Sequence, residues 1–372
     1  MKHVALVVAV CIFLLPKSGF GIEFRRQVQD VRSLGMGNTG IAGAHTSGTI
    51  FYNPAALANI KEGWIDLPSV QAIYSKEAKS FYKDIAGKEF LESEEERKSF
   101  MEEYIGKEIY VQADVGISLF FNFDKKGITV GGNWIYERIY DYEVNNPIVP
   151  EIDAFERFDL IRQIGFSYPI GLGQFVLGLA AKTVERTEKT FVYTTSDLIA
   201  KKEFPVPDVP DVKDGKTANG RGVDIGILWR VPTRYRISFG AVWKSAVDMG
   251  DDVTNIPEES AVGLSTTHAF GLVRWSFALD LRDLSFKQGS EDDKSRNRRI
   301  HAGTELSMFP TSDLNYILSL RAGFNQGYLS TGAELRLGNS LVLGYARYKE
   351  EIGEHAGDKE SERTAMFVSL GF

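Results

Sequence analysis

The stretch YVQADVGISLFFNFD, residues 110–124, alternates between apolar and polar side chains almost without a break. Its odd-numbered positions hold Val111, Ala113, Val115, Ile117, Leu119, Phe121 and Phe123. Polar residues and glycine fill most of the even-numbered positions, and Phe120 is the exception. Because successive side chains of a strand point to opposite faces, this stretch predicts a long β-strand with one apolar and one polar face.

The same alternation recurs at 234–247, 270–283 and 297–309. Strands of soluble domains usually have about 5–6 residues, whereas strands that cross a membrane need about 9–11. A large soluble β-sandwich also has one dry and one wet face, but rarely over spans of this length. Charged residues recur in the middle of the polar faces, which predicts that these faces line the lumen of a barrel. The candidate lumen-lining residues are Arg236, Arg274, Asp280, His301, Glu305, Glu334 and Arg336.

Segments of this kind divide residues 63–372 into about fourteen strands, an even number, as a closed barrel with both ends on one side requires. Among the predicted strands are 64–75, 155–169, 172–186 and 234–247. Short turns at 124–127, 171–173, 231–233 and 337–340 alternate with long connections at 76–108, 142–154, 187–217, 284–296 and 352–360. The short connection at 325–327 is the exception, because a long one is expected there. We therefore predict an all-β fold, a transmembrane antiparallel β-barrel with short periplasmic turns and longer external loops.

The first 21 residues have the organisation of a secretory signal peptide. Lys2 and His3 form a short basic region, an apolar run follows from Val4 to Leu15, and small residues end at Gly21. This run is too short for a membrane-spanning helix, which needs about 20 apolar residues. The only cysteine, Cys11, lies within it, so the mature chain is expected to hold no disulfide. Export and the strand pattern together predict the outer membrane of a diderm bacterium.

Composition excludes several classes of function. The net charge is -7 and no basic stripe is present, which argues against nucleic acid as a partner. The five histidines show no metal-binding spacing, so neither a metal nor a cofactor is expected. A hydrolase on the barrel would need a nucleophile beside a base, and Ser307 with His301 is the one conceivable pair. We therefore expect no enzymatic activity.

A glycine-rich segment, RSLGMGNTGIAGAHTSGTIFYNPAALANI, covers residues 32–60. Gly35, Gly37 and Gly40 match the pattern G-x-G-x-x-G, but a dinucleotide site needs a strand before it and a long helix after it. A polar stretch precedes these glycines, and no long helix fits behind them. Small residues permit tight turns and close packing of the backbone, so residues 22–62 predict a compact plug (hatch) inside the barrel. Pro54 directs Asn53 away from the helical conformation, which predicts a turn there.

This segment resembles the plug of the FadL-like outer-membrane transporters, whose glycine- and alanine-rich plug ends in Asn-Pro-Ala. Asn53, Pro54 and Ala55 match that motif position by position. The last residues, TAMFVSLGF, place Met366, Val368, Leu370 and Phe372 on one face. This ending resembles the C-terminal signal that the barrel assembly machinery reads.

The resemblance implies uptake of hydrophobic compounds, such as long-chain fatty acids. Passage would be by passive diffusion through the plugged barrel, with a lateral exit into outer-membrane lipid. Related plugged barrels serve secretion machinery, so a structural or secretion-associated role without transport is the alternative. An open porin is a third hypothesis.

The long connection at 76–108 contains apolar and aromatic residues among many charges, which predicts one or two amphipathic helices outside the barrel. These helices could present an apolar patch that captures a hydrophobic ligand, or they could simply pack onto the barrel rim.

Overall fold

The computed structural model describes residues 28–60, 63–85, 94–124, 128–145, 151–194, 215–289, 295–311, 315–338 and 340–371. The predicted signal peptide, the ends of the predicted plug at 22–27 and 61–62, and Phe372 lie outside the described residues. No helix in the described part of the chain is long and apolar enough to cross a membrane.

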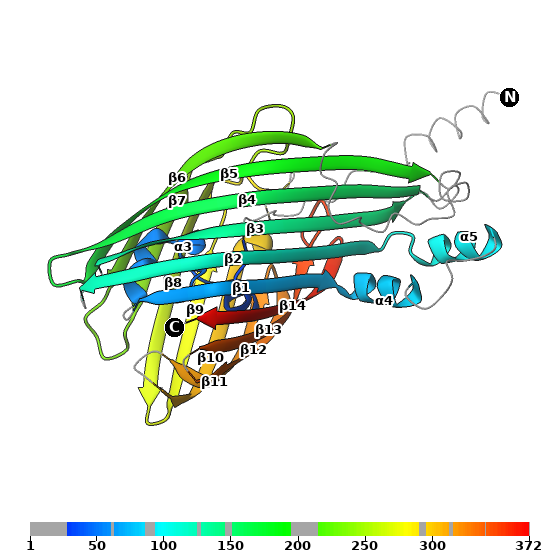
Figure 1. The fold of residues 1–372 in the computed structure, drawn as a ribbon. Helices are drawn as coiled ribbons and strands as arrows, with labels where there is room; N and C mark the ends of the chain where they lie inside the picture. The colour runs from blue at the N-terminus through cyan, green and yellow to red at the C-terminus, as the bar shows by residue number, and fades with distance from the viewer. Residues whose placement is uncertain are drawn as a thin grey trace.

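Fourteen antiparallel strands form one closed barrel, in which each strand pairs with the next and β1 pairs with β14 (Figure 1). This confirms the predicted fold class. The strands are β1 (Trp64–Ser75), β2 (Glu108–Asp124), β3 (Ile128–Asn145), β4 (Glu151–Ile170), β5 (Phe175–Thr194), β6 (Lys216–Arg230), β7 (Ser238–Lys244), β8 (Glu259–Phe270), β9 (Val273–Leu281), β10 (Ile300–Pro310), β11 (Tyr316–Asn325), β12 (Tyr328–Leu337), β13 (Leu341–Glu351) and β14 (Glu360–Gly371).

The two faces of the wall differ in polarity as the alternation predicts. On β2, Val115, Ile117 and Leu119 are exposed on the outer face, while Asp114 and Ser118 are buried on the inner face. Large exposed apolar side chains recur on the outer faces of the other strands. An apolar outer surface around a polar interior is the arrangement of a barrel that stands in lipid.

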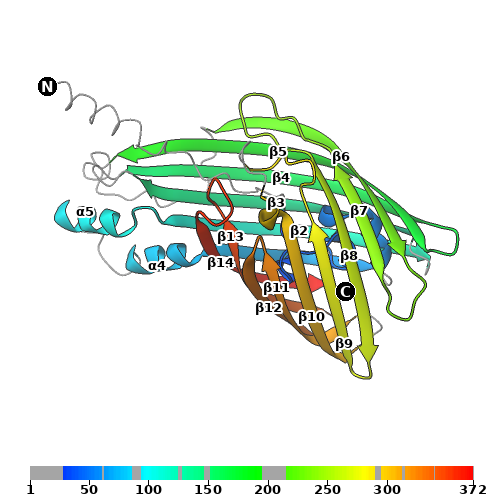
Figure 2. The same cartoon turned by 180° about the vertical axis from the view of Figure 1, so that it is seen from behind.

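The wall is uneven in height. Strands β2 to β6 have 15–20 residues, whereas β7 to β13 have 7–12 (Figure 2). The predicted strand at 64–75 is confirmed, but those at 155–169 and 172–186 were too short, since β4 and β5 each have 20 residues. The predicted strand at 234–247 was too long. Residues 234–237 belong to a turn in which Arg236 has a φ of 46°, and after Lys244 the chain bends into the lumen.

Two helices, α4 (Lys76–Ile85) and α5 (Glu94–Glu103), occupy the connection between β1 and β2. The buried side chains of Phe81, Met101 and Tyr104 pack in one cluster with Tyr142 and Ile152. Those two strand residues lie on the outer face of the wall, because they alternate with lumen-facing neighbours. The helices therefore pack onto the barrel rim, the second of the two arrangements considered for this connection.

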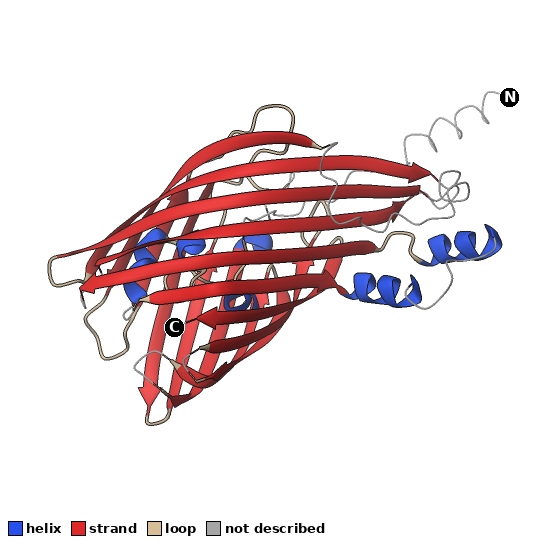
Figure 3. Cartoon of the chain, in the orientation of Figure 1, coloured by secondary structure: helices blue, strands red, loops and turns tan. Residues whose placement is uncertain are grey.

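Short helices of the N-terminal part of the chain lie inside the barrel (Figure 3). They are α2 (Val31–Gly35), α3 (Thr49–Tyr52) and the 3-10 helix η1 (Pro54–Asn59), and most of their residues are buried. We call residues 28–60 the N-terminal segment. The end of the barrel that carries the turns after β2, β4, β6, β8, β10 and β12 is called the short-turn end.

Candidate functional site

The N-terminal segment and the inner wall share an apolar core. Ile50, Leu57 and Ile60 of the segment pack in one buried cluster with Phe120 of β2 and Ile161 of β4. Phe120, the one large apolar residue on the polar face of its strand, is fully buried in this cluster. The exception in the alternation of β2 therefore marks the place where the segment contacts the wall.

Glycines form the part of the wall that the segment touches most closely. A Cβ atom on Gly226 would lie 1.9 Å from Oδ1 of Asn53, and one on Gly178 would lie 2.0 Å from the nitrogen of Ala55. Real Cβ atoms do not come so close to other atoms, so the backbone itself is the contact surface. We call these inward-facing positions the glycine belt: Gly165, Gly178, Gly226, Gly240, Gly263, Gly303, Gly323 and Gly332.

Several members of the glycine belt face each other across neighbouring strands. The pairs are Gly178 with Gly226, Gly240 with Gly263, and Gly303 with Gly323. Sequence reasoning missed the belt, although a signal was present: glycine in the interior of a strand often marks the close approach of another backbone.

Asn53 bonds the N-terminal segment to the wall and also joins two parts of that segment to each other. Its Nδ2 donates to the carbonyl oxygen of Ile41 at 2.8 Å and lies 3.3 Å from that of Ile227 and 3.4 Å from that of Ala241, in β6 and β7. Its Oδ1 accepts from the N–H of Ala55 at 2.9 Å and so caps η1, in which Pro54 is the first residue. An amide supplies both donor and acceptor, which a carboxylate in the same place would not.

The glycines of the G-x-G-x-x-G pattern also have structural roles. Gly37 has a φ of 69°, and a Cβ on it would lie 2.4 Å from two carbonyl oxygens of the wall. A Cβ on Gly35 would lie 3.0 Å from Cα of Gly332, and one on Gly40 would lie 2.5 Å from the ring of Tyr52. Close packing therefore explains these three positions without a nucleotide.

Two predicted lumen residues hold the backbone of the segment. The carboxylate of Asp280 accepts hydrogen bonds from the N–H groups of Gly40 and Ile41, at 2.6 and 3.0 Å. His301 Nδ1 lies 2.9 Å from the carbonyl oxygen of Gly37, so this nitrogen carries the hydrogen in that contact. His301 and Ser307 lie six residues apart along β10, about 20 Å at the rise of a strand, so they do not form a catalytic pair.

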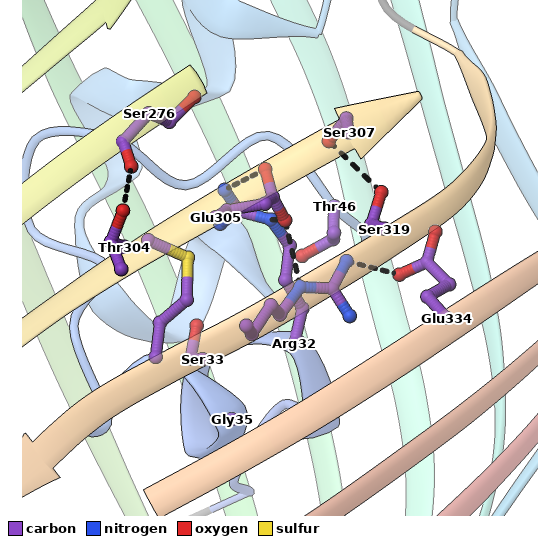
Figure 4. A network of polar contacts seen from close by, with 12 residues as sticks. Arg32, Ser33, Gly35, Thr46, Ser276, Thr304, Glu305, Ser307, Ser319 and Glu334 are labelled. Carbon is purple, nitrogen blue, oxygen red and sulfur yellow. Dashed lines mark hydrogen bonds and ion pairs between the residues drawn. The ribbon is translucent and has the colours of Figure 1, made fainter. Parts of the chain in front are cut away.

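An ion-pair network links α2 to β9–β12 (Figure 4). Arg32 donates to Glu305 through two nitrogens, at 2.9 and 3.0 Å, and Arg321 donates to the same carboxylate at 2.7 Å. Arg274 lies 3.6 Å from Glu305. Glu334 accepts from Arg321 at 2.7 Å and lies 3.6 Å from Arg336. In the described network four arginines thus share two carboxylates.

A cavity of about 470 Å³ lies between the N-terminal segment and the short-turn end. Gly43, His45 and Asn59 line it from the segment, and Arg230 and Arg274 line it from the wall. Arg236, predicted to line the lumen, is exposed in the turn before β7 and contributes to the mouth of this cavity. Burial lowers the pKa of His45 well below its ordinary value, and Arg32 and Arg274 lower it further, so its imidazole is neutral.

On the side away from the short-turn end, the N-terminal segment faces the connection between β7 and β8, which folds into the lumen. Sequence reasoning also missed this connection. Residues 245–258 follow β7, and Val247 and Met249 pack against the inner face of β6 at Gly220. Arg186 of β5 donates to the carbonyl of Thr254 at 2.7 Å, and Glu188 accepts from its N–H at 2.7 Å. The segment and this connection thus occupy neighbouring levels of the lumen. Within the described ranges no group of three or more His, Cys, Asp or Glu residues could hold a metal ion.

The fold is shared with solved hydrocarbon channels. A TodX monoaromatic hydrocarbon channel with a deletion has a TM-score of 0.54 and 11% identity, over 95% of this chain and 99% of that one. The Pseudomonas putida toluene transporter TodX has a TM-score of 0.51 and 11% identity, over 94% and 98%. The CymD monoaromatic hydrocarbon channel has a TM-score of 0.50 and 14% identity, over 95% and 97%. These similarities confirm the predicted FadL-like barrel fold. No protein family model and no curated protein sequence matches the chain.

Replacing Gly226 by valine is expected to displace the N-terminal segment, because the new side chain would occupy the position of the Asn53 amide. Overpacking of this kind costs about 1–3 kcal/mol. The expected result is a higher ion conductance of the purified protein in planar bilayers. Ala181→Val is the control, since it adds the same side chain to the exposed outer face of the adjacent strand β5. Equal conductance of the two variants would contradict the packing described here.

Glu305→Gln is expected to lower the free energy of unfolding by about 3–5 kcal/mol, the usual effect of removing one partner from a buried ion pair. The control is Glu360→Gln, which removes the charge of Glu360 from its exposed ion pair with Lys349. This variant should lower the free energy of unfolding by about 0–1 kcal/mol. Urea titration of both variants in the same detergent measures the difference. Similar losses in the two variants would show that the network contributes little.

Proposed function

We propose that this protein is an outer-membrane transporter for hydrophobic compounds, in which the N-terminal segment acts as the plug. The observation that carries the proposal is the apolar core inside the lumen, where Ile50 and Leu57 of the segment meet Phe120 and Ile161 of the wall. A shift of the segment would expose apolar surface on both sides. That surface suits a hydrophobic solute better than water or ions.

The similar structures support a hydrophobic substrate, because they are named as channels or transporters for toluene and monoaromatic hydrocarbons. They are not named as enzymes, and we propose no catalytic role. Long-chain fatty acids belong to the same broad class of solute, and each buried methylene contributes about 0.8 kcal/mol to partitioning. Uptake would be passive and driven by the concentration gradient.

A lateral exit is the route we propose into the membrane. Strand β7, with seven residues, is the shortest of the described strands, and it pairs with β6 and with β8 through seven residue pairs each. Opening the wall beside β7 therefore breaks fewer backbone hydrogen bonds than opening it between β4 and β5. The apolar outer face of β6 and β8 would then receive the solute on its way into lipid.

The same features support the location that we propose. The apolar outer face and the alternation of short and long connections support an outer-membrane barrel of a diderm bacterium, with the short-turn end in the periplasm. The predicted signal peptide would direct export. Strand β14, the last of the barrel, would carry the signal for the barrel assembly machinery.

Uptake into liposomes tests the proposal directly. Vesicles that contain the purified full chain should take up labelled toluene or oleate faster than protein-free vesicles, while labelled sucrose stays excluded. Gly226→Val should lose the exclusion of sucrose, and Ala181→Val should not. If neither hydrophobic solute enters faster and a partner protein co-purifies, the structural or secretion-associated alternative replaces transport. Rapid entry of sucrose through the unmodified protein would instead identify an open porin.

A further inference from the structure

Three neighbouring strands, β4 to β6, carry a row of polar side chains on the outer face of the wall (Figure 1). Arg162 of β4 pairs with Thr183 of β5, and Thr183 pairs with Arg221 of β6. All three side chains are exposed, and they alternate with lumen-facing residues, so they point away from the barrel. Neighbouring strands lie about 4.8 Å apart, which places the two arginines about 10 Å from each other with the threonine hydroxyl between them.

This row lies at the margin of the apolar outer surface, on the side away from the short-turn end. Arg162 is eight residues before Ile170, where β4 ends, and Arg221 is nine before Arg230, where β6 ends. At the rise and usual tilt of barrel strands, these spans are about 20 and 23 Å along the barrel axis, close to the apolar band of about 25 Å in membrane barrels. The exposed side chains within these spans are apolar or aromatic, among them Ile164, Phe166, Leu177, Leu179, Val223 and Ile225.

The two arginines have no anionic partner in the described part of the chain. Neither Arg162 nor Arg221 forms an ion pair or a side-chain hydrogen bond with a described residue. Cζ of Arg162 lies 5.1 Å from the centre of the Trp134 ring, which belongs to its pairing partner on β3. Glu185 lies on the same outer face, two residues beyond Thr183, and it forms no ion pair with a described residue either. Both guanidinium groups are therefore available to an anion from outside the protein.

The basic residues on the outer face of β13 differ in this respect. Arg347 forms an ion pair with Glu362 of β14, and Lys349 forms one with Glu360. That part of the wall thus supplies its own negative charge, whereas β4 and β6 present positive charge to the surroundings of the barrel. Positive charge at the margin of an apolar surface is complementary to a membrane amphiphile with an anionic head group.

We propose that Arg162, Thr183 and Arg221 form a site on the outer wall for the phosphate of an anionic lipid, whose hydrocarbon chains lie along the apolar surface of β4 to β6. The inference goes beyond the proposed function, because this lipid is a component of the surrounding membrane and not a transported solute. With the short-turn end in the periplasm, as proposed, the lipid belongs to the outer leaflet. Guanidinium groups bind phosphate through two parallel hydrogen bonds, and the hydroxyl of Thr183 supplies a further donor.

Native mass spectrometry of the purified full chain in a neutral detergent tests this inference, with diphosphorylated lipid A and phosphatidylcholine as probes. We expect lipid A to bind at least tenfold more tightly, roughly the effect of one hydrogen bond to a charged group, because the choline of the other lipid cancels the charge of its phosphate. Arg162→Gln and Arg221→Gln should each weaken the binding of lipid A by about tenfold. Glu185→Gln should strengthen it by about twofold to fivefold, because it removes one exposed negative charge near the site.

Arg347→Gln is the matched control, since it removes an outer-face arginine that already has a carboxylate partner. This variant should bind lipid A as the unmodified protein does. Equal losses in the Arg347, Arg162 and Arg221 variants, or equal binding of the two lipids, would overturn the inference. Displacement of lipid A by an equal concentration of inorganic phosphate would also overturn it, because the site would then be one for soluble anions. Failure here leaves the proposed function intact, because the uptake of toluene into liposomes is measured separately and needs no bound lipid A.

Discussion

Direct contact between two backbones is the constraint on which the rest of this structure depends. The N-terminal segment fits inside the barrel because the glycine belt leaves no side chain between it and the strands. The same closeness determines the residues of the segment. Asn53 has room for an amide that bonds to carbonyls of the wall, and Ala55 has room for one methyl group beside Gly178. The motif Asn-Pro-Ala is therefore one half of an interface whose other half is glycine.

Charge and apolar surface occupy different parts of that interface. Toward β9–β12 the segment is held by charged side chains. Arg32 forms an ion pair with Glu305, and two backbone N–H groups donate hydrogen bonds to Asp280. Toward β2–β5 it is fixed by apolar packing around Phe120 and Ile161. Breaking a buried ion pair is strongly destabilising, whereas apolar surfaces have no directional bonds that a sliding movement must break. A displacement of the segment would therefore begin on the apolar side, which is also the side that a hydrophobic solute can occupy.

The sequence predicted the barrel because lipid and lumen impose opposite demands on neighbouring residues, and this leaves a period of two in most of the strands. It predicted less about the lumen. Arg274, Glu305, Glu334 and Arg336 were identified as inward-facing charges. Arg32, which lies 273 residues before Glu305 in the chain, and Arg321 of the adjacent strand β11 were not among the candidates. The inward bend after Lys244 was missed for a similar reason, since it depends on the space that Gly220 leaves on a different strand. Gly178 and Gly226 could have been recognised, because each interrupts an otherwise regular strand.

The alternation of apolar and polar residues also does not indicate whether the outer face of a strand is covered by lipid or by another part of the protein. Along β4, Ile164 is 69% exposed, whereas Ile152, on the same face of the same strand, is fully buried in the cluster with α4 and α5. Ile164 lies within the predicted strand at 155–169, whereas Ile152 lies in the predicted connection at 142–154. In the structure the first stands free on the outer wall and the second is covered by protein. This explains why β4 and β5 exceed the length that a membrane requires. Their additional residues extend beyond the apolar band, and the helices between β1 and β2 supply the apolar contacts that lipid provides farther down the wall.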